Sequence, residues 1–184
     1  MSSTHTDLAA YRQRAAQAVQ SIPADKVERA VRRLQACRAA NQMVWVLGNG
    51  GSQANAQHLV LHLRQAGIAA IDLLADNAFI SAEANDLGWH GIPVRGFSHY
   101  PKPGAIIVIS GSGNSLNVVD LLRNFADVPT IGLLGMGGGR ALAMCDVAIV
   151  VDSAEYGPVE DAQAAVVHML AAGLQAPVHG PSAS

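Results

Sequence analysis

The segment Val44–Ser52 reads Val-Trp-Val-Leu-Gly-Asn-Gly-Gly-Ser, and it decides the fold. Its first half is an apolar, β-type run that ends in a glycine-rich turn, and a helical pattern over Gln53–Arg64 follows directly. Such a junction presents free backbone N–H groups and the positive end of a helix dipole, which favour an anionic oxygen. His58 and His62 share one face of that helix, because residues four apart are neighbours. The segment therefore predicts an anion cradle and a candidate metal or acid–base site on one element.

The composition indicates a single α/β domain. The 184 residues are 50% hydrophobic and 14% charged, which is typical of buried parallel strands and excludes a disordered chain. The net charge of −2 predicts no nucleic-acid partner. The longest apolar runs are far too short to span a bilayer, so we expect no membrane contact. Cys37 and Cys145 are the two cysteines, so we expect no disulfide framework and a reducing, cytoplasmic location.

Strand and helix patterns alternate along the chain. Strand-like runs cover Met43–Leu47, Ala69–Leu74, Ala105–Ser110, Thr130–Leu134 and Val147–Val151. Helical patterns cover Leu8–Val19, a segment that starts near Pro23, Gln53–Gln65, Ala78–Asn85, Ser115–Asn124, Gly139–Met144 and Val159–Leu174. This order predicts a doubly wound parallel sheet covered on both faces, in one domain over residues 1–184. We expect the first helix to pack on a partner subunit and the tail Ala176–Ser184 to be frayed.

In such sheets ligands bind at the carboxyl ends of the strands, so the loops that leave the strands are candidate site segments. The loop Gly48–Ser52 lacks the glycine spacing of a dinucleotide site and the lysine of a P-loop, and a tight turn without a ligand stays an alternative. The loop Ser110–Ser115 offers three hydroxyls at a strand–helix junction, and two such loops favour a phosphorylated small molecule. The segment Ala84–Gly88 carries Asn85 and Asp86, which either form a turn or hold sugar hydroxyls.

A further group of polar residues lies on the last helical pattern. Glu160, Asp161 and His168 interrupt an otherwise apolar stretch. A histidine on such a face is either a core residue or a ligand. Glu160 and His168 would lie about 12 Å apart along a helix axis, so spacing alone leaves open whether both reach one ion with His58 and His62.

Several segments resemble the sugar isomerase (SIS) domain, in order and nearly without gaps. They are Gly48-Asn49-Gly50-Gly51-Ser52 with His58, Asn85-Asp86-Leu87-Gly88, Ser110-Gly111-Ser112-Gly113-Asn114-Ser115, Gly132-Leu133-Leu134-Gly135 with Gly138-Gly139 and Asp146, and His168. The narrower resemblance is to the phosphoheptose isomerases, and it extends from about Asn41 to Leu174. It implies one SIS domain with a five-stranded sheet, N-terminal helices over residues 1–40 that help build a homotetramer, and active sites at subunit interfaces. It also implies aldose–ketose isomerisation of sedoheptulose 7-phosphate to D-glycero-D-manno-heptose 7-phosphate, a step toward the heptoses of lipopolysaccharide or other surface glycans.

The resemblance further implies roles for individual residues. The phosphosugar would be bound by Asn49, Gly50, Gly51, Ser52, Asn85, Asp86, Ser110, Gly111, Ser112 and Ser115. A divalent ion, zinc in the family, would be held by His58, His62, Glu160 and His168, a ligand set that also suits nickel, cobalt or iron. Isomerisation through an enediol needs a base and an acid–base partner, and the catalytic residues would be His62, Glu160 and His168, with Glu160 or His62 as the base.

The sequence departs from the family pattern at functional positions. His62 stands where the family has Glu, and Glu160 where it has Gln, so the formal charge around the ion is unchanged. Gly111 replaces the usual Thr, which removes one hydroxyl from the second loop, and Gly157 replaces an acidic residue.

The segment Gly91–Pro101 also departs from the family, which has a helix there. Pro93, Gly96 and Pro101 make that helix improbable, so we expect a rebuilt wall over the sugar. Two alternatives stay open. One is the same chemistry on another phosphosugar, such as an octulose phosphate. The other is a non-catalytic SIS protein that binds partners, as a relative that bridges copies of a replication initiator does. The four metal-capable side chains argue against the second alternative.

Overall fold

Within residues 7–175, which a computed structural model describes, five strands form one parallel sheet in the order β2-β1-β3-β4-β5. The strands are β1 (Val44–Gly48), β2 (Ala70–Asp72), β3 (Ala105–Ser110), β4 (Thr130–Leu134) and β5 (Val147–Val150). The helices are α1 (Leu8–Gln20), α2 (Ala24–Ala39), α3 (Gly51–Gln65), α4 (Asn77–Leu87), α5 (Ile92–Phe97), α6 (Leu116–Asn124) and α7 (Tyr156–Gln175), with 3-10 segments η1 (Trp89–Gly91) and η2 (Met136–Met144).

The sheet confirms the predicted doubly wound α/β fold. The first strand, β1, pairs with β2 on one side, and β3, β4 and β5 follow in order on its other side. The strand order therefore switches between β1 and β3. The predicted strands agree with the observed ones within one residue, except that the run Ala69–Leu74 contributes only the three residues of β2. The predicted tail, Ala176–Ser184, lies outside the described residues.

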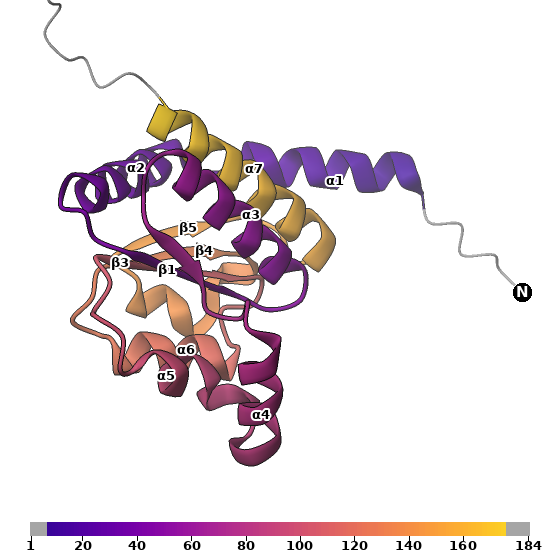
Figure 1. Cartoon of the computed structure of the whole chain (residues 1–184). Helices are drawn as coiled ribbons and strands as arrows, with labels where there is room; N and C mark the ends of the chain where they lie inside the picture. Colours follow the sequence, from indigo (N-terminus) through magenta and orange to yellow (C-terminus); the bar gives the residue numbers. More distant parts are fainter. Residues whose placement is uncertain (1–6, 176–184) are drawn as a thin grey trace, which may run out of the picture.

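Two apolar layers hold the helices on the sheet. Successive side chains of β1 point to opposite faces, so Val44 and Val46 join one core and Trp45 and Leu47 the other. Helices α2, α3 and α7 cover the first face, and α4, α5 and α6 cover the second (Figure 1). No helix in residues 7–175 is long and apolar enough to cross a membrane.

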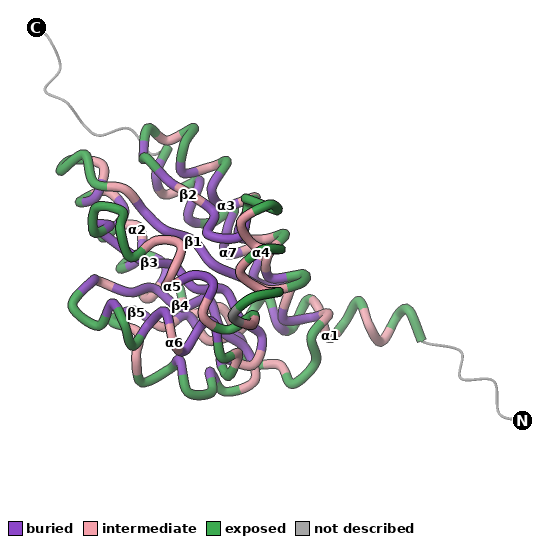
Figure 2. The backbone as a smooth tube through the Cα atoms, turned by 60° about the horizontal axis from the view of Figure 1, so that its bottom comes forward, coloured by how far each residue is buried: buried purple, intermediate pink, exposed green. Residues whose placement is uncertain are grey.

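The two N-terminal helices have different surroundings. Helix α2 belongs to the core of its own chain, because its apolar face, which includes Val27 and Leu34, is buried under the sheet. Helix α1 packs on α7, where Tyr11 donates a hydrogen bond of 2.8 Å to Asp161, but most of its surface is exposed (Figure 2). The expected packing on a partner subunit therefore stays a prediction, and it concerns α1 more than α2.

The prediction against a helix in segment 91–101 is wrong. Residues Ile92–Phe97 form α5, and Pro93 lies in its first turn. A proline is compatible with that position, because the first-turn N–H groups have no partner within the helix. Pro101 lies beyond the helix and does not interrupt it.

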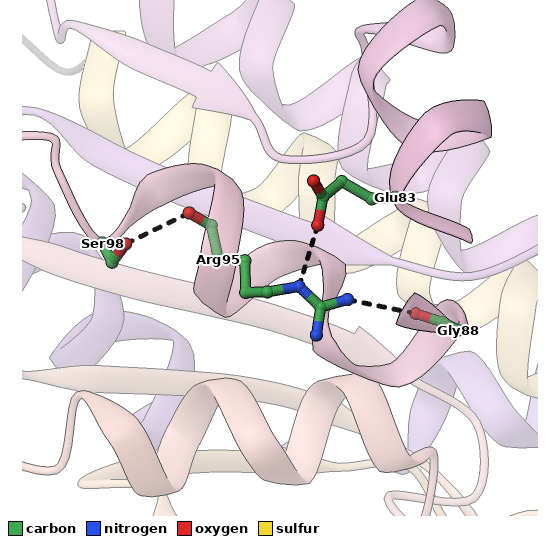
Figure 3. A network of polar contacts seen from close by, with 4 residues as sticks. All are labelled: Glu83, Gly88, Arg95 and Ser98. Carbon is green, nitrogen blue, oxygen red and sulfur yellow. Dashed lines mark hydrogen bonds and ion pairs between the residues drawn. The ribbon is translucent and has the colours of Figure 1, made fainter. Parts of the chain in front are cut away.

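A polar network fixes α5 to the preceding segment (Figure 3). Arg95 donates from Nε to Glu83 of α4 at 2.8 Å and from a terminal nitrogen to the carbonyl of Gly88 at 3.4 Å. Ser98 donates to the carbonyl of Arg95 at 3.1 Å, just after the helix. These contacts offset the low helix propensity of Gly96 and explain why propensity alone failed here.

Candidate active site

A cavity of about 250 Å³ opens at the switch point between β1 and β3. Its walls come from three places: the loop after β1, the loop after β3, and the first turns of α7. The lining residues are Asn49, Gly50, Gly51, Ser52, Ile109, Ser110, Gly111, Ser112, Ser115, Tyr156 and Glu160. Both loops that the sequence singled out thus meet at one cavity, where a doubly wound sheet is expected to bind its ligand.

The first loop is held by side-chain amides. Gly50 has φ +55°, a left-handed conformation that favours glycine, and α3 begins at the next residue. Asn49 and Asn117 exchange two hydrogen bonds, of 2.9 and 2.8 Å, which tie the loop to α6. Ser52 is buried and donates to Gln163 of α7 at 3.0 Å. The N-terminus of α3 therefore faces the cavity in a fixed position.

The second loop is supported by its own hydroxyls and by a glycine turn. Ser110 accepts from the Gly113 N–H at 3.1 Å, and Ser112 accepts from the Asn114 N–H at 3.2 Å. The glycines of η2 at positions 137–139 have positive φ angles and bring that turn against the loop. A Cβ on Gly113 would overlap the carbonyl of Gly138, so the two backbones are in direct contact. The serine loop is therefore shaped by backbone packing.

Helix α7 contributes one carboxylate and one aromatic ring to the cavity. A Cβ on Gly51 would overlap the Glu160 carboxylate, which therefore lies directly over the start of α3. A Cβ on Gly111 would lie 3.0 Å from two ring carbons of Tyr156. No Lys or Arg is among the described residues that line this cavity. The donors available to an anion here are hydroxyls, amides and backbone N–H groups.

Three histidines form a separate group farther along the same two helices. His58 and His62 of α3 and His168 of α7 each offer a ring nitrogen, and these atoms lie within 4.8 Å of one another. The Nε2 atoms of His58 and His62 are 3.0 Å apart, and Nδ1 of His62 is buried without a hydrogen-bond partner in the described part of the chain. Partial burial, and then the neighbouring imidazoles, lowers the pKa of His58. Three imidazoles gathered in this way could hold a metal ion.

Comparisons with known proteins place the chain among sugar isomerases. Residues 9–135 match the SIS domain family. The chain is 36% identical over 158 residues to the phosphoheptose isomerase of Trichlorobacter lovleyi, covering 81% of this chain and 80% of that protein. The chain belongs to the phosphoheptose isomerase family. It is also 35% identical over 140 residues to the phosphoheptose isomerase of Rhodospirillum rubrum, covering 71% and 74% of the two chains.

Solved structures of this phosphoheptose isomerase family agree with the fold. The enzyme from Francisella tularensis superposes with a TM-score of 0.85 at 25% identity, covering 95% of this chain and 98% of that one. The enzyme from Neisseria gonorrhoeae gives a TM-score of 0.83 at 26% identity, covering 90% and 93%. The correspondence therefore extends through α7, beyond the residues of the family match.

The structure brings together some predicted site residues of this family member and leaves others apart. Glu160 is not in the histidine group, because its carboxylate faces Gly51 in the cavity. Asn85 and Asp86 lie in the last turn of α4 and not in a loop, because α4 continues to Leu87. Both are exposed, Asn85 donates to Asp86 at 2.8 Å, and neither lines the cavity. Their contact with a sugar stays a prediction.

The structure adds residues that the sequence reading missed. Gln163 and Asn117 are buried and hold the first loop through Ser52 and Asn49, and Tyr156 lines the cavity. Gln163 could have been found, because it is a lone amide within an apolar helical run, where a polar group needs a partner. Tyr156 carried no such signal, since a tyrosine at a helix start is ordinary.

Proposed function

We propose that this chain is an aldose–ketose isomerase that converts sedoheptulose 7-phosphate to D-glycero-D-manno-heptose 7-phosphate. The observation that carries the proposal is the cavity at the switch point, where two serine- and glycine-rich loops face one carboxylate. The named relatives are phosphoheptose isomerases, which supports the choice of sugar. The case for another phosphosugar rested on a missing helix over 91–101, and α5 is present there.

The phosphate would be bound by neutral donors. Ser52, Ser110, Ser112 and Ser115 line the cavity, and the positive end of α3 opens into it. The Ser52 hydroxyl already donates to Gln163, so Ser52 would offer its backbone N–H and the other three serines their hydroxyls. Sites that enclose a whole ligand usually measure about 300–1,000 Å³. A cavity of about 250 Å³ therefore suits the phosphate end and leaves part of the sugar outside this wall.

The three histidines fit a divalent metal, and we infer zinc. Nitrogens of a tetrahedral zinc site lie about 3.3 Å apart, given Zn–N bonds of about 2.0–2.1 Å. The Nε2 atoms of His58 and His62 are 3.0 Å apart, and one ring nitrogen of His168 lies within 4.8 Å of both histidines, so the three side chains are close enough to hold one ion. Three imidazoles leave a fourth position open, as in catalytic zinc sites. A bound ion would stabilise the negative charge that develops on the sugar oxygens during enolisation.

Glu160 is then the base in this proposal. If His58, His62 and His168 hold the ion, they are not free to accept a proton, whereas Glu160 is the carboxylate that lines the cavity. It would take the proton from one of the two carbons that exchange the carbonyl and return it to the other. Asn55 donates to the Glu160 carbonyl at 3.0 Å and helps to hold this turn of α7 against α3.

An isomerase assay on sedoheptulose 7-phosphate, combined with metal analysis of the purified protein, tests the proposal. We expect turnover that a chelator abolishes and zinc restores. His58→Ala should lose both metal and turnover, while His90→Ala, at an exposed histidine outside the site, should keep both. Absence of turnover in a zinc-loaded protein that binds the sugar phosphate would refute the enzymatic role and favour a binding protein.

The quaternary structure is also a proposal. We infer a homotetramer in which α1 provides contacts, because Leu8 and Val19 on this helix are 76% and 39% exposed. Light scattering of the full chain and of a Leu8→Glu/Val19→Glu variant tests it, and a monomeric wild type would refute it. The cytoplasmic location stays a prediction.

A further inference from the structure

The ring of Tyr156 rests on Gly111 at the edge of the phosphate cavity. Gly111 belongs to the serine loop, and the nearest side-chain atoms to its missing Cβ are Cδ1 and Cε1 of Tyr156, each at 3.0 Å. A side chain at position 111 would meet this ring. The glycine therefore makes room for the tyrosine.

Tyr156 also lines the cavity beside Glu160. Tyr156 and Glu160 are four residues apart on α7, so they share one face, and both line the cavity. Tyr156 is 61% exposed, and its hydroxyl has no hydrogen-bond partner within residues 7–175. By contrast, the Tyr11 hydroxyl is engaged with Asp161. A free phenol that lines an anion cavity can donate to the bound group.

The serine loop leaves a gap in its set of donors at this point. Ser110 and Ser112 supply hydroxyls on either side of Gly111, and both already accept bonds from loop N–H groups, so each can still donate. Gly111 itself supplies no hydroxyl. The ring that packs against this position belongs to Tyr156, whose hydroxyl is a further donor among the residues that line the cavity.

We propose that Tyr156 is a substrate-binding residue whose hydroxyl donates a hydrogen bond to the phosphate group. We further propose that the ring can occupy its position only because residue 111 is a glycine. The proposal rests on the proposed function only for the identity of the phosphosugar. The contact itself concerns the phosphate and holds for any phosphorylated ligand of this cavity.

Binding of inorganic phosphate, measured by calorimetry, tests the contact without turnover. Tyr156→Phe removes only the hydroxyl, and we expect Kd to rise about tenfold, the loss typical of one hydrogen bond to a charged group. KM for sedoheptulose 7-phosphate should rise by a similar factor, with kcat little changed. Tyr100→Phe is the matched control, because Tyr100 is 53% exposed and lies outside this cavity, and its constants should equal those of the wild type.

A pair of variants tests whether the position of the Tyr156 ring requires a glycine at residue 111. Gly111→Thr alone should weaken phosphate binding about tenfold, because its Cβ would lie 3.0 Å from two ring carbons and the γ atoms of threonine extend beyond the Cβ, so the ring and its hydroxyl have to shift. In the Gly111→Thr/Tyr156→Ala double variant the threonine hydroxyl has room, and binding should recover to within about threefold of the wild type, so the two changes are not additive.

Each outcome decides one part of the proposal. Unchanged phosphate binding in Tyr156→Phe overturns the proposal, and so does a raised KM with unchanged phosphate binding, because the contact would then be with the sugar. If Gly111→Thr weakens phosphate binding equally in the wild type and in Tyr156→Ala, the glycine is not needed for the position of the Tyr156 ring, and that part of the proposal is wrong. If no sugar phosphate is turned over and Tyr156→Phe still weakens phosphate binding, the proposed function fails and this inference stands.

Discussion

Replacing Gln163 by Met should weaken the contact between the loop Gly48–Ser52 and the sheet. Gln163 is fully buried, donates to the carbonyl of Leu133 in β4 at 3.1 Å, and accepts from the Ser52 hydroxyl at 3.0 Å. Methionine has a similar shape and can form neither bond. The substitution therefore removes two hydrogen bonds and creates little cavity.

The magnitude follows from the two groups left behind. The buried Leu133 carbonyl loses its side-chain donor, which costs about 1–3 kcal/mol, whereas the Ser52 hydroxyl can turn to the cavity and find water. A loss of about 2 kcal/mol lowers the Tm of a domain of this size by about 4–8 °C. Ser52 is then free to rotate, so KM for the phosphosugar should rise severalfold, up to about tenfold.

Thermal unfolding at fixed protein concentration and steady-state kinetics measure both effects. Ser52→Ala is the matched variant, because it removes the hydroxyl and keeps the amide. If Gln163 acts through Ser52, Gln163→Met should add little to the KM of Ser52→Ala. An unchanged Tm, or a full KM effect of Gln163→Met in the Ser52→Ala background, would refute the reasoning.

Other consequences can be measured separately. Glu160→Gln should lower kcat about 10²–10⁴-fold in the isomerase assay while inorganic phosphate binds at least as tightly in calorimetry, since a negative charge leaves the cavity. His62→Ala should weaken zinc binding, measured by competition with a metal chelator, by more than about 100-fold. Loss of a residue that only hydrogen-bonds to a ligand costs about 10–100-fold in metal affinity, and His62 would be a ligand itself. Burial and the nearby Asp146 charge raise the pKa of Cys145 to about 12, and burial raises that of Cys37, so a thiol reagent at pH 8 should label the folded protein far more slowly than the unfolded one. Arg95→Ala should lower the Tm by about 2–4 °C in thermal unfolding, because a half-buried ion pair worth about 1 kcal/mol is lost.

Local sequence patterns predicted the sheet and the two loops, because each strand ends in a turn with its own composition. The run Val44–Leu47 followed by Gly48 and Gly50 requires no distant contact to be recognised as a strand and a turn. The same local reasoning failed for α5, where Arg95 binds Glu83 and Gly88 of the preceding segment. Tertiary contacts override propensity there, and no single-residue preference contains them.

The site was predicted in part for a similar reason. The i, i+4 spacing brought His58 and His62 together correctly, but only the packing of α3 on α7 adds His168. Glu160 lies two helical turns before His168, and its carboxylate faces Gly51. Helix spacing predicted the separation between Glu160 and His168 along α7. The direction of the Glu160 side chain depends instead on the space beside Gly51, where the neighbouring loop has no side chain.

The glycines of the serine loop and of the η2 turn together determine what this cavity can bind. A Cβ on Gly113 would overlap the carbonyl of Gly138, and a Cβ on Gly139 would overlap that of Ser112, so backbone packs on backbone around the serines. Because no Lys or Arg is among the described lining residues, an anion is bound there by directed donors and the dipole of α3. The carboxylate of Glu160 opposes any anion that does not place its charge on the serine side. Binding therefore depends on the shape of the ligand as well as its charge, which is what a phosphate at the end of an uncharged sugar supplies.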